Sequence, residues 1–303
     1  MKKKSDEKLK IIPLGGLEQI GMNITAFECQ DSIVLVDCGL AFPEDDMLGV
    51  DLVIPDVTYL LENADKVKGL CITHGHEDHI GAIPYILKQI NMPIYATKLT
   101  NGLIENKLKE HGMLRTVKRK VVKYGQSINL GCFRIEFIKT NHSIQDAAAL
   151  ALFSPAGIVV HTGDFKVDYT PVFGDAIDLQ RFGEIGKKGV LALLCESTNA
   201  ERSGFTPSEK TVGRVFDNLF SEYSDTRIII ATFASNVDRV QQIINSAHKY
   251  GRKVVVEGRS MVNVIATASE LGYLNIPENT LNEGDQLKNY PDEQTVLITT
   301  GSQ

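Results

Sequence analysis

Residues 73–79, Thr-His-Gly-His-Glu-Asp-His, gather a dense set of potential metal ligands. Three of the seven histidines of the chain lie here, at His74, His76 and His79, together with the carboxylate of Asp78. Imidazole nitrogens and carboxylate oxygens bind zinc while leaving coordination positions open for water. The spacing H-x-H-x-D-H divides the ligands into two pairs, so we interpret the segment as a motif for two metal ions.

Asp78 also has a simpler interpretation, because a carboxylate at this place can cap the helix that we expect near Gly81. We favour metal binding, since a helix cap does not explain why three imidazoles accompany this carboxylate within six residues. Two ions need more ligands than one loop offers. The remaining ligands must therefore come from other parts of the chain.

Two further candidate ligands follow predicted strands downstream. His142 follows the strand expected at 134–139, and Asp164 follows the strand expected at 157–160. A lone histidine or a turn aspartate is usually structural, but loops at the edge of a sheet often hold functional groups. Together with residues 73–79, these two residues complete a ligand set for two ions.

Asp37 and Glu196 are acids at the ends of apolar strands, which we expect at 33–36 and 190–195. Both should reach the same edge of a sheet, where a carboxylate can orient a ligand imidazole without touching the metal. We assign them this supporting role. The other histidines are interpreted as structural: His111, His161 and His248.

Short β-branched runs closed by Gly, Pro or Asp predict that the first part of the chain is rich in strands. Apolar spacing predicts helices there at 81–90 and 98–111. Thereafter helices alternate with compact apolar runs, which indicates a parallel α/β layer. We therefore expect two domains, at 1–205 and 206–303.

Composition narrows the class of protein. A formal net charge of −6 argues against binding of nucleic acid by bulk positive charge, and the basic stretch 107–123 is interpreted as a solvated helix and an edge strand. Five cysteines without a C-x-x-C pair indicate buried thiols in a reducing compartment. No signal peptide or apolar run of about 20 residues is present, so we expect a cytoplasmic protein without membrane contact.

The chain ends at residues 299–303, directly after a predicted buried strand. In an open α/β sheet, a loop at this place normally helps to build a ligand crevice. Natural chains seldom end in such a loop. We expect that the 303 residues are a fragment of a longer protein.

The candidate ligands, taken with Asp37, resemble the metal motifs of the metallo-β-lactamase superfamily. The acid in residues 195–199, the α/β insertion with residues 231–236 and the ending at 301–303 are similar to its β-CASP branch, which processes nucleic acids. Four further segments resemble the bacterial ribonuclease J family within that branch: 14–16 (LGG), 42–44 (FPE), 161–166 (HTGDFK) and 258–260 (GRS).

The resemblance implies an α/β fold, in which an αββα sandwich without its C-terminal return is followed by a partial β-CASP domain. It also implies two zinc ions, with these ligands: His74, His76 and His142 on one, Asp78 and His79 on the other, and Asp164 as a bridge. In the implied mechanism the ions hold a bridging hydroxide, with Asp78 and Asp164 as catalytic residues. Nitrogen and oxygen ligands also accept manganese.

Members of the family cut RNA internally and also degrade it from a 5′ monophosphorylated end, in RNA processing and decay. RNA is therefore the implied substrate, and a homo-oligomer or a hetero-oligomer with a paralogue is the implied assembly. The family helps to hold substrate phosphate with the loop that contains Thr232, Ser235 and Asn236 here, where donors at a helix start suit an anion. A helix-capping role for Ser235 is equally credible.

Two alternative functions stay open. A metallo-β-lactamase-fold hydrolase of thioesters or lactones would share the motif at 74–79 but would lack the α/β insertion after residue 205. A catalytically weak subunit or fragment would bind RNA or a partner without cutting. Decay of the metal motif would mark such a subunit, whereas Asp78 and His79 are intact here.

Overall fold

The computed structural model describes residues 7–300, which form two compact units. The first unit consists of residues 7–142, Asp146–Lys166 and Ile177–Ser203. The second consists of Ser143–Gln145, Val167–Ala176 and residues 204–300. The domain limits expected from the sequence, 1–205 and 206–303, stay a prediction.

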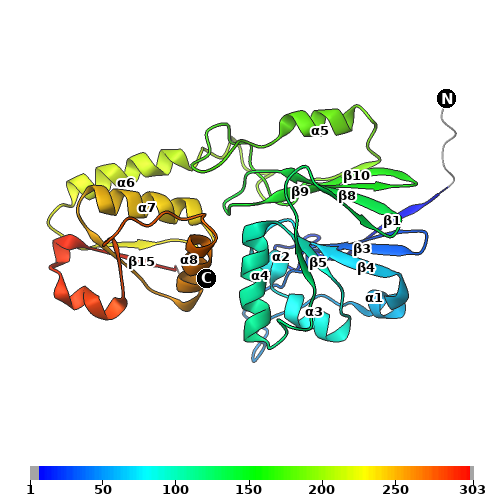
Figure 1. Ribbon diagram of the computed structural model, residues 1–303, viewed down its shortest axis with the longest axis horizontal. Coiled ribbons are helices and arrows are strands. Elements are labelled where there is room, and N and C mark those ends of the chain that lie inside the picture. Colours follow the sequence, from blue (N-terminus) through cyan, green and yellow to red (C-terminus); the bar gives the residue numbers. More distant parts are fainter. Residues whose placement is uncertain (1–6, 301–303) are drawn as a thin grey trace. The chain divides into compact units, whose positions relative to one another are not determined.

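The larger of two sheets in the first unit has six strands, arranged in chain order (Figure 1). Its strands are β1 (Leu9–Gly15), β2 (Ile24–Cys29), β3 (Ser32–Val36), β4 (Val67–Cys71), β5 (Ile94–Ala96) and β6 (Arg119–Val121). Strands β1 to β3 are antiparallel, and β3 to β6 are parallel. Because β3 and β4 run side by side in the same direction, Asp37 and the segment 73–79 emerge at the same edge.

The smaller sheet has five strands in the order β11-β10-β9-β8-β7. They are β7 (Ser127–Leu130), β8 (Phe133–Lys139), β9 (Ala148–Ser154), β10 (Gly157–His161) and β11 (Ala192–Leu194). Strands β8 and β10 are both antiparallel to β9, and β11 is parallel to β10. The carboxyl ends of β8, β10 and β11 therefore share one edge, where His142, Asp164 and Glu196 follow.

Helices cover the outer faces of the two sheets (Figure 1). The larger sheet is accompanied by α1 (Thr58–Glu62), the 3-10 turn η1 (Ala64–Lys66), α2 (Glu77–Ile80), α3 (Ile83–Gln89) and α4 (Lys98–Glu110). Helix α5 (Leu179–Gly186) packs on the smaller sheet through Phe182 and Ile185. Asp178 caps α5, because its side chain accepts the N–H of Arg181.

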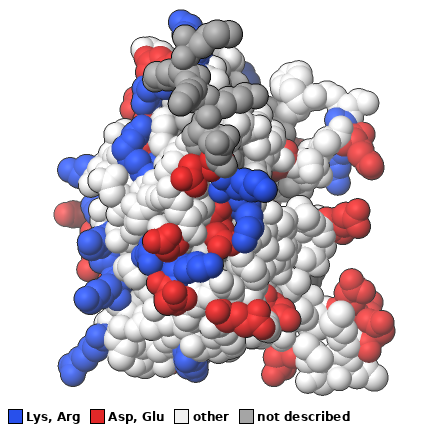
Figure 2. Space-filling model, turned by 90° about the vertical axis from the view of Figure 1, so that its right-hand side faces the viewer, with Lys and Arg blue, Asp and Glu red and all other residues white. Residues whose placement is uncertain are grey.

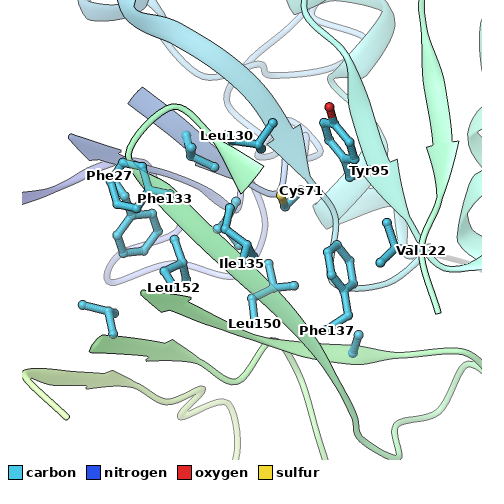
Figure 3. Packing of buried hydrophobic residues seen from close by; sticks show 14 of the residues in the cluster. Phe27, Cys71, Tyr95, Val122, Leu130, Phe133, Ile135, Phe137, Leu150 and Leu152 are labelled. Carbon is cyan, nitrogen blue, oxygen red and sulfur yellow. The ribbon is translucent and has the colours of Figure 1, made fainter. Parts of the chain in front are cut away.

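The main core of this unit lies between its two sheets (Figure 3). Phe27 and Cys71 of the larger sheet pack in the same cluster as Phe133, Ile135 and Leu152 of the smaller one. Each fully buried Leu or Phe side chain contributes about 1.5–3 kcal/mol. Alternate residues of β9 point the other way, toward α5. Two packed sheets with helices outside confirm the expected αββα sandwich.

The second unit is built on a parallel sheet with the order β12-β15-β13-β14. Its strands are β12 (Ile228–Ala231), β13 (Lys253–Val256), β14 (Leu281–Asn282) and β15 (Thr295–Thr299). Its helices are α6 (Lys210–Glu222), α7 (Val237–Lys249) and α8 (Arg259–Glu270), with 3-10 turns η2 (Gly284–Asn289) and η3 (Asp292–Gln294). The expected parallel α/β layer is confirmed.

The structure corrects some of the predicted elements. The single helix expected at 81–90 is two short helices, α2 and α3, and α2 begins earlier, at Glu77. Asp78 therefore lies inside a helix whose N-cap is His76, so Asp78 is not a cap. Cys195 is exposed, whereas a buried thiol was expected. Every helix within residues 7–300 is too short or too polar to span a lipid bilayer.

Candidate metal centre

Three imidazole nitrogens converge on one point in the first unit. His76 Nδ1 lies 3.0 Å from His74 Nε2 and 3.1 Å from His142 Nε2. Nitrogen ligands about 2.0–2.1 Å from a tetrahedral zinc ion lie about 3.3 Å from each other. The spacing of the three nitrogens therefore fits one zinc-sized cation, and these residues form a group able to hold a metal ion.

A second group of ligand atoms adjoins the first. His79 Nε2 lies 3.3 Å from Asp78 Oδ2 and 3.6 Å from Asp164 Oδ2. The same Asp164 oxygen lies 3.8 Å from His142 Nε2. Asp164 thus stands between the two groups, which is the position that a carboxylate shared by two ions would occupy.

Asp37 supports both groups from a buried position at the end of β3. Its carboxylate accepts the N–H of Thr73 at 2.8 Å, the hydroxyl of Thr73 at 2.8 and 3.1 Å, and the Nδ1–H of His79 at 2.8 Å. The backbone of Asp37 has a φ of 61°, in the left-handed region that non-glycine residues seldom adopt. Such backbone strain persists where the surroundings fix it, often at functional sites.

These hydrogen bonds decide which nitrogen of two rings carries a proton. A carboxylate only accepts, so the Thr73 hydroxyl donates to Asp37 and its oxygen accepts from His74 Nδ1 at 3.0 Å. His74 Nε2 is thereby left with a lone pair directed at His76. His79 likewise donates through Nδ1, so Nε2 is the nitrogen that faces Asp78 and Asp164.

Burial tunes the first group for metal binding. Loss of hydration lowers the pKa of His74 well below 6.5, and it lowers the pKa of His76 to about 3 and that of His142 to about 4, with help from neighbouring imidazoles. All three rings are therefore neutral at pH 7. Neutral imidazole is the form that binds a metal ion.

The second group has the opposite electrostatics. Burial alone would lower the pKa of His79, but the charge of Asp37 and hydrogen bonds to Asp164, Asp37 and Asp78 raise it well above 6.5. Burial alone would raise the pKa of Asp164, but the hydrogen bond and charge of His79 bring it to about 2. An anionic pair of carboxylates around His79 favours a cation, whether a proton or a metal ion.

Other predicted site residues lie in varied surroundings. Glu196 follows β11 at the expected edge, but its carboxylate accepts the N–H of Thr198 at 2.9 Å, and its orienting role stays a prediction. His161 Nδ1 accepts the N–H of Gly163 at 3.1 Å, and burial lowers the pKa of His161, which fits a structural role.

Gly163, directly before Asp164, has a φ of 58°, and a Cβ added at Gly163 would lie 2.8 Å from the side chain of Thr73.

The proposed phosphate loop lies at the start of α7 in the second unit. Asn236 is the N-cap of α7, because its Oδ1 accepts the N–H of Arg239 at 3.0 Å. Ser235 is therefore not the capping residue. Thr232 is 7% exposed, and its hydroxyl oxygen has no hydrogen-bond partner among the described residues. A buried hydroxyl without a partner close to a helix start suits an anion.

Asn23 belongs to the centre but does not stand out in the sequence. Its side-chain amide approaches Asp78 and His79, 55 and 56 residues further along the chain. Asparagine is an ordinary polar residue at a strand start, and nothing in the local pattern reports such a distant contact.

Two family models match this chain. The model for the metallo-β-lactamase superfamily matches residues 23–183, and the model for the β-CASP domain of ribonuclease J matches residues 225–303. A solved structure of a protein of unknown function from Enterococcus faecalis has the same fold, with a TM-score of 0.69 at 17% identity, over 98% of this chain and 78% of that one.

Curated proteins are similar over nearly the whole chain. It is 50% identical to "Ribonuclease J" of Synechocystis sp., over 98% of this chain and 47% of the relative. It is 46% identical to "Ribonuclease J" of Helicobacter pylori, over 99% of this chain and 43% of the relative. It is 42% identical to "Ribonuclease J2" of Bacillus subtilis, over 100% of this chain and 54% of the relative. The chain spans about half the length of these relatives.

Proposed function

Because the chain belongs to the metallo-β-lactamase superfamily, we propose that it provides the metal centre of a ribonuclease that hydrolyses RNA phosphodiester bonds. The observation that carries the proposal is the position of Asp164 between two groups of ligand atoms, 3.6 Å from His79 Nε2 and 3.8 Å from His142 Nε2. Similarity to curated ribonuclease J proteins, at 42–50% identity, supports RNA as the substrate.

The donor set supports two divalent cations. In the proposal, His74, His76 and His142 hold one ion, and Asp78 and His79 hold the other, with Asp164 shared. Mixed nitrogen and oxygen donors without thiolate suit zinc and also accept manganese. When bound, two such ions activate water at neutral pH and offset the charge that gathers on a phosphorus under attack.

The surrounding residues of the chain prepare this chemistry. Asp37 fixes the rings of His74, through Thr73, and of His79 directly. The carboxylates of Asp78 and Asp164 would keep the attacking water oriented between the ions. Replacement of a residue that orients metal ligands, as Asp37 does here, typically lowers metal affinity or activity by about 10–100-fold.

Both basic and acidic side chains occur on the face in Figure 2, so this face does not present charge of one sign to a substrate. In the basic stretch noted in the sequence, Lys107 pairs with Glu77, and Arg119, on the edge strand β6, pairs with Glu105. In the second unit, we propose that the loop with Thr232 and Asn236 binds a substrate phosphate. Both internal cutting and removal of nucleotides from a 5′ monophosphorylated end are part of the proposal.

The test compares wild-type protein with His76→Ala and with His248→Ala, a control that changes an exposed histidine of α7. Metal content is measured together with cleavage of a 5′ monophosphorylated RNA, a circular RNA and a thioester. We expect about two ions and RNA cleavage in the wild type and the control, and loss of both in His76→Ala. Unchanged RNA cleavage by His76→Ala would refute the mechanism, and thioester cleavage without RNA cleavage would refute the substrate.

A further inference from the structure

Asn23 lies between the two segments that build the second group of ligands. Its backbone N–H donates to the carbonyl of Asp78 at 3.1 Å, and its own carbonyl accepts the N–H of Gly39 at 3.0 Å. Gly39 follows Asp37 by two residues, and Cys38 between them donates its N–H to the carbonyl of His79 at 2.8 Å. The start of β2 is therefore tied into the metal centre through main-chain bonds.

The side chain of Asn23 also contacts the second group of ligands. Its Nδ2 lies 3.1 Å from the carbonyl oxygen of Asp78, 3.2 Å from Asp78 Oδ2 and 3.2 Å from His79 Nε2. An amide NH₂ has two hydrogens, which match the two acceptors that Asp78 offers. His79 Nε2 and Asp78 Oδ2 are the same atoms that would face the second ion.

There is little room on the Oδ1 side of this amide. Gly16, which has a φ of 81°, approaches so closely that an added Cβ would lie 2.7 Å from Asn23 Oδ1. A larger residue at position 16 would push the amide away from Asp78. Within residues 7–300, the hydrogen bonds of the Asn23 side chain reach Asp78 and His79, and none reaches the three histidines of the first group.

We propose that Asn23 is a positioning residue for the second metal ion, a role that rests on the proposed two-metal function. The amide donates to the main-chain carbonyl and to the carboxylate of Asp78, beside His79 Nε2. Both of these hydrogen bonds could persist if an ion replaced the proton of His79 Nε2. The carboxylate of Asp78 would then be oriented by Asn23 before the ion binds.

An amide suits this place better than a carboxylate. An aspartate at position 23 would remove both donors and add a third negative group beside Asp78 and Asp164. It would also add an oxygen donor next to the second ion, which favours manganese over zinc.

The test measures metal affinity and needs no RNA. The full chain that the gene encodes is purified and stripped of metal. It is then titrated with Zn²⁺ against a competing chelator, so that the affinities for the two ions are resolved. We expect Asn23→Ala to weaken binding of the second ion by about 10–100-fold and to leave the first unchanged. In Asn23→Asp, we expect the preference of the second site to move from zinc toward manganese.

Asn91→Ala is the matched control, because this exposed asparagine also donates to a backbone carbonyl, that of Thr116, but lies away from the ligand atoms. Wild-type affinity for the second ion in Asn23→Ala would overturn the proposal. Equal weakening of both ions, together with a lower unfolding temperature of the metal-free protein, would also overturn it, because that result identifies a general structural role. A wild type that binds two ions but cuts no RNA would contradict only the proposed function.

Discussion

Asp37 Oδ2 accepts the Nδ1–H of His79 at 2.8 Å, and both side chains are almost fully buried. The same carboxylate accepts the hydroxyl of Thr73, which in turn fixes the ring of His74. One acid therefore sets the orientation of a ligand ring in each of the two groups. Asp37 contacts neither of the Nε2 atoms that would bind the ions. We nevertheless expect it to affect the binding of both ions, because it orients both rings.

Replacement of Asp37 by asparagine tests this relationship with little change in shape. Asparagine tolerates the positive φ of this position, but its amide group cannot accept from Thr73 and His79 as a carboxylate does. We expect affinity for both ions to fall by about 10–100-fold, as is typical for partners of ligand imidazoles. Chelator competition measures the loss. A variant in which only one affinity changes would contradict the shared role.

The two ions should respond differently to acid. The raised pKa of His79 means that a proton occupies this ring below that pKa, so the second ion must displace it. Between pH 7 and pH 5 we therefore expect affinity for the second ion to fall, by up to about tenfold per pH unit. The pKa values of His76 and His142, about 3 and about 4, lie below this window, so protons do not compete for the first ion there.

Metal content after dialysis at a series of pH values measures this difference. The expected result is two ions near pH 7, one near pH 5 and none near pH 3. Release of both ions together between pH 7 and pH 5 would contradict the prediction that protons compete for the second ion but not for the first.

The sequence indicated those candidate ligands whose signal is local. His74, His76, Asp78 and His79 lie in one segment, and His142 and Asp164 follow strands that β-branched runs predict. Asn23 was missed because its role depends on packing against residues 55 positions away.

The same limit applies to the fold. Strands β5 and β6 have three residues each, too few to show a period, and they are held by pairing with neighbours. Cys195 follows β11, a strand at the edge of its sheet, where an apolar sequence does not ensure burial. The resemblance to the ribonuclease J family, drawn from short motifs, is confirmed by the family models and relatives.

Gly39 is required by close packing of the backbone. A Cβ at this position would lie 1.5 Å from the carbonyl oxygen of Asp78, so Gly39→Ala must push apart two segments of the metal centre. We expect it to lower the free energy of unfolding by about 3 kcal/mol or more, beyond ordinary overpacking. Chemical denaturation of the metal-free protein measures the change.

Gly183→Ala is the control for Gly39→Ala, since nothing lies within 4 Å of a Cβ added at this glycine inside α5. Alanine is favoured over glycine within a helix, so we expect this variant to gain up to about 1 kcal/mol. If both variants unfold at the same denaturant concentration as the wild type, the prediction that Gly39 packs too closely on Asp78 to admit a side chain is wrong.

Arg181 anchors α5 to the smaller sheet through the buried carboxylate of Glu136, with bonds of 2.6 and 2.9 Å. Removal of one partner from a buried pair leaves an uncompensated charge, at a cost of about 3–5 kcal/mol. We expect a smaller loss of about 2 kcal/mol for Arg181→Met, because its side chain is 28% exposed and because Arg134 Nη1 also lies 3.7 Å from the Glu136 carboxylate. The double variant Arg181→Met with Glu136→Gln should recover part of this loss, because the amide carries no charge. Equal stability of the single and double variants, measured by denaturation, would show that the buried charge of Glu136 is not what Arg181 compensates.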